Sequence, residues 1–183
     1  MLLDRIIAFT LGTIFLLVLA CDGPAAEKSE AIAETRTRTL LNDPAFWDYA
    51  ASSNMLQVQV SELAVEKATN ARTREFAQNV TTYHADALKQ LENLVAGHDN
   101  IRLPDSLGGA DQGLLQDMAL LEGEAFDLRY REFVLSTHHA QLNRYEEALV
   151  KADDQKTREW IINLREHLRE KINQISEPDS AAL

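Results

Sequence analysis

Hydrophobic positions in the central and C-terminal parts of the chain recur three and four residues apart, the spacing of an α-helix with one buried face. Asp43 and Pro44 favour a helix start, because Asp caps free backbone N–H groups and Pro suits the first helical turn. No stretch alternates polar and apolar residues for long enough to predict a strand. The pattern therefore predicts an all-α fold with long helices over about 44–70, 71–96, 124–151 and 154–176.

The lengths of the links between these helices indicate how they pack. The first link and the last link are short, which favours antiparallel neighbours. The middle link begins at Gly97 and contains a predicted short helix over about 110–121. These features predict a four-helix bundle with an extra short helix between the second and third long helices.

The N-terminal segment is typical of a targeting sequence. Residues 1–20 contain an apolar run of about fifteen residues after Arg5, shorter than the roughly 20 that span a bilayer, and so read as a signal peptide. Val18-Leu19-Ala20-Cys21 resembles a bacterial lipobox, in which the cysteine becomes the lipidated N-terminus. Asp22 resembles an inner-membrane retention signal, which slightly favours the inner membrane. Residues 21–42 are small and polar, as in a flexible tether.

The predicted organisation places the protein in the bacterial cell envelope, as a periplasmic lipoprotein held to the membrane by its N-terminal lipid. It comprises a signal peptide over 1–20, lipidated Cys21 with its tether over 21–42, a helical domain over 43–177 and a tail over 178–183.

The net charge of the chain excludes one class of partner. Its 183 residues carry 29 acidic and 18 basic side chains, a formal net charge of −11. Such a surface lacks the basic stripe that neutralises phosphates, so no nucleic-acid partner is expected. A homodimer stays open, since nothing in the sequence identifies a pairing face, and the partner protein is unknown.

Three of the five histidines border predicted buried faces near the midpoints of their helices: His84, His138 and His167. In an antiparallel bundle of matched helices they share one level. Gln57 reaches the same level from the first helix, with Ala50 and Ala64 on its face.

Two interpretations of this layer remain open. Neutral imidazoles are common transition-metal ligands, so His84, His138 and His167 with Gln57 or water could hold a single ion such as zinc, copper, nickel or iron. The same residues could instead form a buried hydrogen-bond network that sets helix register. The sequence does not decide between them.

The body resembles a bacterial family called domain of unknown function 4142, which is ferritin-like in fold and common in envelope lipoproteins. The resemblance is carried by an ordered set of residues: Ser53-Asn54-Met55, Phe76-Ala77-Gln78, His84, Leu103-Pro104, Phe126-Asp127, Tyr130, His138 and His167-Leu168. It implies a ferritin-like four-helix bundle. Asp127 lies about 16 Å along the helix axis from His138, too far to share one ion, so we expect Asp127 and Tyr130 to be structural and to hold the short helix to the bundle. Where the family has carboxylates near its histidines, this chain has Gln57, Gln59, Tyr83 and Thr137.

Catalytic chemistry is not evident in the sequence. A ferritin-type di-iron centre needs Glu-x-x-His on two helices. Thr81, Leu135 and Leu164 stand three residues before the three histidines, so no such centre is expected. No Gly-x-Ser-x-Gly elbow or phosphate-binding glycine loop occurs either. We expect no catalytic residues, and a binding or structural role more readily than an enzyme.

Overall fold

The computed structural model describes residues 39–176, and the regular elements in that part of the chain are all helices, with no strand. None of its helices is both long and apolar enough to cross a membrane. Its elements are the 3₁₀ turn η1 (Leu40–Asn42) and the α-helices α2 (Pro44–Lys67), α3 (Ala71–Val95), α4 (Gly109–Ala119), α5 (Gly123–Lys151) and α6 (Gln155–Ser176).

Local sequence explains where the helices begin and end. The Asp43 carboxylate accepts from the Phe46 N–H at 3.3 Å, and Pro44 opens α2. The side chain of Asn70 accepts from two N–H groups in the first turn of α3. Gly123 begins α5 with a φ of +60°, a conformation that favours glycine. The predicted helices are therefore present, with ends that differ by a few residues.

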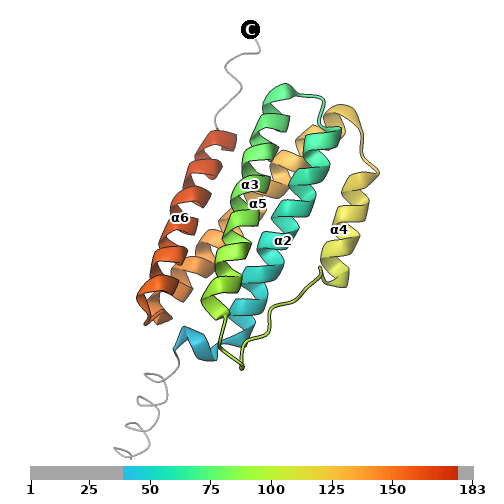
Figure 1. The fold of residues 1–183 in the computed structure, drawn as a ribbon. Helices are drawn as coiled ribbons and strands as arrows, with labels where there is room; N and C mark the ends of the chain where they lie inside the picture. Colours follow the sequence, from blue (N-terminus) through green and yellow to red (C-terminus); the bar gives the residue numbers. More distant parts are fainter. Residues whose placement is uncertain (1–38, 177–183) are drawn as a thin grey trace, which may run out of the picture. The chain divides into compact units, whose positions relative to one another are not determined.

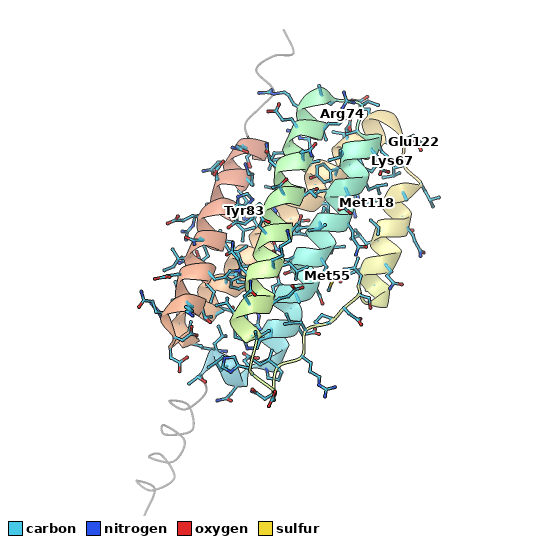
Figure 2. The ribbon with its side chains drawn as sticks, in the orientation of Figure 1. Met55, Lys67, Arg74, Tyr83, Met118 and Glu122 are labelled. Carbon is cyan, nitrogen blue, oxygen red and sulfur yellow. The ribbon has the colours of Figure 1, made fainter. Side chains whose placement is uncertain are left out.

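The four long helices form a helical bundle. α2 packs along α3 and α5 along α6, and further contacts join α2 to α5 and α3 to α6 (Figure 1). The short α4 lies beside α2, on the side away from α6 (Figure 1). At the C-terminal end of α4, Lys67 of α2 donates to the Ala119 carbonyl and to Glu122, both at 2.6 Å (Figure 2). α4 is thereby held against α2.

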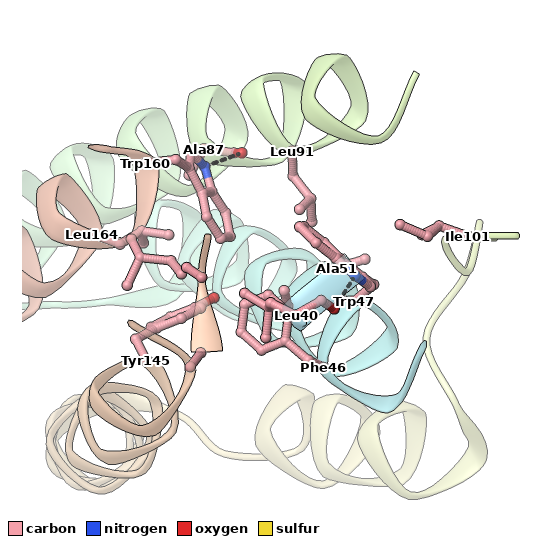
Figure 3. Close-up of a cluster of buried hydrophobic side chains, with 14 of the residues drawn as sticks. Leu40, Phe46, Trp47, Ala51, Ala87, Leu91, Ile101, Tyr145, Trp160 and Leu164 are labelled. Carbon is pink, nitrogen blue, oxygen red and sulfur yellow. Dashed lines mark hydrogen bonds between the residues drawn. The ribbon is translucent and has the colours of Figure 1, made fainter. Parts of the chain in front are cut away.

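The apolar core is divided into two clusters. One gathers around Trp47, Tyr145 and Trp160, and includes the Trp160 indole N–H donating to the Ala87 carbonyl at 3.2 Å (Figure 3). The other surrounds Phe126 and includes Val60, Ala77, Tyr130 and Val134. On α2, α3 and α5, buried polar residues lie beside or between the two clusters, and these polar residues form the candidate site.

The folded part begins earlier than the sequence pattern predicts. Leu40 is 1% exposed, and its carbonyl accepts from the Trp47 indole N–H at 3.0 Å (Figure 3). The predicted tether ended at residue 42, and that boundary was wrong because a buried leucine and a backbone acceptor tie 40–42 to the core. A single apolar turn is too short to show helical periodicity.

Candidate functional site

A layer of buried polar side chains crosses the bundle between the two apolar clusters. Its most deeply buried members, each at most 1% exposed, come from three helices: Asn54 and Gln57 on α2, His84 on α3, and His138 and Gln141 on α5. Buried polar groups cost free energy unless they are hydrogen-bonded. The positions of their protons therefore determine what this layer can do.

Asn54 fixes the tautomer of His84. The Asn54 Nδ2 group donates to the Ala50 carbonyl at 2.7 Å and to the Tyr145 hydroxyl at 3.2 Å. Its Oδ1 therefore faces His84 Nδ1, 2.8 Å away. An amide oxygen only accepts, so His84 Nδ1 carries the proton and, in the neutral ring, Nε2 holds the lone pair.

His84 in turn fixes the tautomer of His138. The two Nε2 atoms lie 3.3 Å apart, and the rings are tilted by 37°. Since His84 Nε2 can only accept, His138 Nε2 carries the proton and donates it. The lone pair of the neutral His138 ring is therefore on Nδ1, which is buried without a hydrogen-bond partner in the described part of the chain.

His167 of α6 reaches the same layer from the other side. Its ring stacks on Tyr83 with centroids 3.3 Å apart, and it lies edge-on to His84 with centroids 5.8 Å apart. The Tyr83 hydroxyl donates to the Asn163 carbonyl at 2.9 Å, which ties α3 to α6. His167 is half-buried, and its Nε2 is a buried atom without a hydrogen-bond partner among the described residues.

The orientation of the Gln57 amide is also determined by its neighbours. Thr137 donates its hydroxyl proton to the Phe133 carbonyl at 2.7 Å, so its oxygen accepts from Gln57 Nε2 at 2.6 Å. Gln57 Oε1 consequently points elsewhere, and it too is buried without a partner in residues 39–176. Gln57 therefore presents an unused acceptor to the layer.

Burial keeps the three imidazoles neutral. It holds the pKa of His84 well below the usual 6.5, reinforced by the rings of His138 and His167. Burial, with smaller effects of His167 and Lys171, lowers the pKa of His138 to about 3. For His167, burial and the Lys171 charge lower the pKa to about 4, against a small opposite effect of Glu170. All three rings are therefore neutral at neutral pH, and the lone pair of His84 is the one already used, by the His138 N–H.

Gln141 and Lys171 also belong to the layer. Gln141 lies four residues from both Thr137 and Tyr145 on α5, and neither its Oε1 nor its Nε2 has a hydrogen-bond partner among the described residues. Lys171 of α6 is 7% exposed, and its ammonium donates to Glu170 at 3.2 Å and Gln174 at 2.9 Å. The layer thus contains unused acceptors beside one buried cation.

Comparison with known proteins identifies the family of this chain. Residues 26–177 match the family described as "Domain of unknown function (DUF4142)". The chain belongs to the DUF4142 family. No curated protein and no solved structure was found to match it.

In this DUF4142 chain, the sequence-predicted residues reach two different places. His84, His138, His167 and Gln57 meet in the polar layer, as the midpoints of their helices predict. His98 and His139 are exposed. No group of three or more His, Cys, Asp or Glu side chains within residues 39–176 is arranged to hold a metal ion.

Asp127 and Tyr130 lie at the other end of the bundle and are structural in their contacts. The Asp127 carboxylate accepts from the N–H groups of Thr69 and Asn70 and from the Thr69 hydroxyl, the last at 2.6 Å. Tyr130 shares a 2.8 Å hydrogen bond with Ser61. The residue spacing had predicted that this pair holds the short helix. Asp127 instead holds the α2–α3 connection, and Tyr130 bonds to α2.

Sequence reasoning missed several members of the layer, and its N-terminal prediction falls elsewhere. Asn54 and Lys171 were not identified, although Asn54 lies four residues after Ala50 on the face that also holds Gln57, a spacing that could have revealed it. Cys21, the predicted lipidation site, lies outside the described residues.

Proposed function

We propose that this protein is a lipid-anchored, ferritin-like four-helix module of the bacterial envelope, and that it acts by binding or as a structural component rather than as an enzyme. Four features support the proposal: the pairing of the four long helices, the extra helix in the middle link, the DUF4142 family, and the cysteine that follows an apolar run.

The observation that carries this proposal is the closed state of the polar layer. His84 and His138 are 0% exposed, and they are bonded to each other and to Asn54. A diffusing substrate has no access to such groups, whereas a bonded buried network specifies how the helices pack. The layer therefore supports a role in positioning helices.

A second candidate function is transition-metal binding, and a specific observation favours it. The lone pairs of His138 Nδ1 and Gln57 Oε1 are buried without partners, as is His167 Nε2. Leaving a buried polar atom unsatisfied costs about 1–3 kcal/mol. An ion bound by these atoms would remove that cost, and imidazole suits zinc, copper, nickel and iron.

Metal content separates the two candidates. The full chain is purified from membranes of its expression host in detergent, and bound metal is measured by mass spectrometry. A variant carrying His84→Ala, His138→Ala and His167→Ala is measured beside it, with circular dichroism to confirm that both are helical. Equal, substoichiometric metal in the two proteins supports the structural role, whereas stoichiometric metal that the variant loses supports metal binding.

A further inference from the structure

Five of the seven buried side-chain atoms without a hydrogen-bond partner among the described residues gather at one level of the bundle; the other two are Thr81 Oγ1 and Arg165 Nε. Contacts between helices set the register: Gln57 meets Thr137, His84 meets His138, and Tyr83 meets His167. Gln141 is one turn from Thr137 on the same face of α5. The unsatisfied atoms on Gln57, His138, Gln141 and His167 therefore come from three helices and share one layer.

These atoms are mostly acceptors. The Thr137 contact leaves Gln57 Oε1 free, the His84 contact leaves His138 Nδ1 free, and the Gln141 amide offers an oxygen as well as a nitrogen. Acceptors are satisfied by a donor such as water or by a cation. The layer can therefore bind a hydrogen-bond donor or a positive ion.

The chemistry of the acceptors narrows the class of ion. Magnesium and calcium take carboxylate and other oxygen ligands. The one buried carboxylate among the described residues, Asp127, is occupied at the α2–α3 connection. The imidazole nitrogens of the layer instead favour a first-row transition ion such as Zn²⁺.

We propose that His138 binds a transition-metal ion through Nδ1, with His167 Nε2 and the amide oxygens of Gln57 and Gln141 as further ligands. His84 is then a positioning residue and not a ligand. His84 Nε2 accepts a hydrogen bond from the His138 Nε2–H group, and Asn54 Oδ1 accepts one from the His84 Nδ1–H group. Such outer partners orient ligating histidines in known metal sites. This inference rests on the second candidate function and assigns separate roles to its histidines.

Zn²⁺ added to the full chain in detergent tests the assignment. Long-range ¹H–¹⁵N spectra of the imidazoles distinguish protonated, free and metal-bound nitrogens. We expect one Zn²⁺ per chain, bound to Nδ1 of His138, with His84 still protonated on Nδ1 and free of metal. His139→Ala is the matched control, because this exposed neighbour on α5 should not change binding.

Two substitutions of His84 give an independent readout. His84→Gln keeps an acceptor for the His138 proton, so Zn²⁺ affinity should fall by less than about tenfold. His84→Leu removes that acceptor, and affinity should fall by about 10–100-fold. Circular dichroism of each variant confirms that the helices persist.

The outcomes are distinct. Zn²⁺ bound to Nε2 of both His84 and His138, with equal losses in the two His84 variants, overturns this inference and leaves metal binding intact. Absence of stoichiometric Zn²⁺ binding to the wild-type chain overturns the inference and the second candidate function together.

Discussion

The Asn54 amide oxygen lies 2.8 Å from His84 Nδ1 and determines which nitrogen of that ring carries the proton. The effect continues to the neighbouring ring, because His84 Nε2 must then accept from His138. One amide on α2 thus sets the tautomers of two imidazoles on α3 and α5. The relationship links helix packing to the chemistry of the layer.

Replacing this amide should destabilise the fold. In Asn54→Ala the buried His84 Nδ1–H and the Tyr145 hydroxyl each lose a partner. We expect the free energy of unfolding to fall by about 1–3 kcal/mol, measured by urea denaturation. Asn79→Ala, at an exposed position on α3, should change it by less than about 0.5 kcal/mol. Equal stability of Asn54→Ala and wild type would contradict the network.

Stability should fall as the solution becomes acidic. The pKa values of His138 and His167 are lowered to about 3 and about 4, so below pH 6.5 the unfolded chain binds protons that the folded chain does not. Unfolding is favoured as pH falls towards those values, and each such ring adds about 1.4 kcal/mol per pH unit to the slope. The Lys171 charge lowers the pKa of both rings further, whereas Glu170 raises the pKa of His167.

Urea denaturation of the metal-free protein between about pH 7.5 and 4.5 measures this slope. His138→Leu should reduce the slope of the free energy of unfolding against pH by the contribution of one imidazole. The exposed His139 exerts only the last-ranked effect on His138, so His139→Ala should change the slope less than His138→Leu does. A slope that the His138 substitution does not alter would show that this ring is protonated in the folded protein.

The buried ammonium of Lys171 should weaken cation binding in the layer. Its charge acts on His138 and His167, whose pKa values it lowers. Lys171→Met keeps the length of the side chain and removes the charge, so Zn²⁺ affinity should rise, as measured by calorimetry. Lys156→Met, at an exposed position on α6, should have no effect. Lower affinity in Lys171→Met would mean that the lysine supports the site.

Asp127 should stabilise the turn between α2 and α3. It accepts three hydrogen bonds from Thr69 and Asn70, and losing a carboxylate that caps backbone N–H groups costs about 0.5–2 kcal/mol. We expect Asp127→Ala to lower the melting temperature and to speed hydrogen exchange at the start of α3. Glu124→Ala, one turn away and exposed, should do neither.

The anchor prediction concerns Cys21. Cys21→Ser removes the thiol that a lipid would modify, so the protein should leave the membrane fraction and lose fatty-acid labelling. The unchanged chain, fractionated in parallel, provides the reference. Membrane retention and labelling that persist in the variant would rule out lipidation at this residue.

The sequence predicted the helices because their start signals and apolar spacing are local. Asp43, Pro44 and Asn70 act on their own first turns, and the clear periodicity of α3 and α6 marked the buried faces around His84 and Leu164. The level of the histidines followed from helix length and rise alone. These properties need no information from distant parts of the chain.

Along α2 the prediction was weaker, for a physical reason. The apolar pattern favoured one face of six residues, of which three are buried and three half-buried: Phe46, Leu56 and Val60 are buried, and Tyr49, Ser53 and Leu63 are half-buried. The core side also carries Asn54 and Ser61. Polar residues can be buried only where a partner meets them, and the partners here are far along the chain: Asn54 meets Tyr145, 91 residues away.

The sequence by itself therefore determined the helices, their order and the shared level of three histidines. Only the tertiary structure decided which nitrogen of His84 and of His138 holds a proton, because that depends on the Asn54–His84 and His84–His138 contacts between separate helices. It also decided which acceptors stay unused, since hydrogen-bond satisfaction belongs to the assembled layer and not to any one helix.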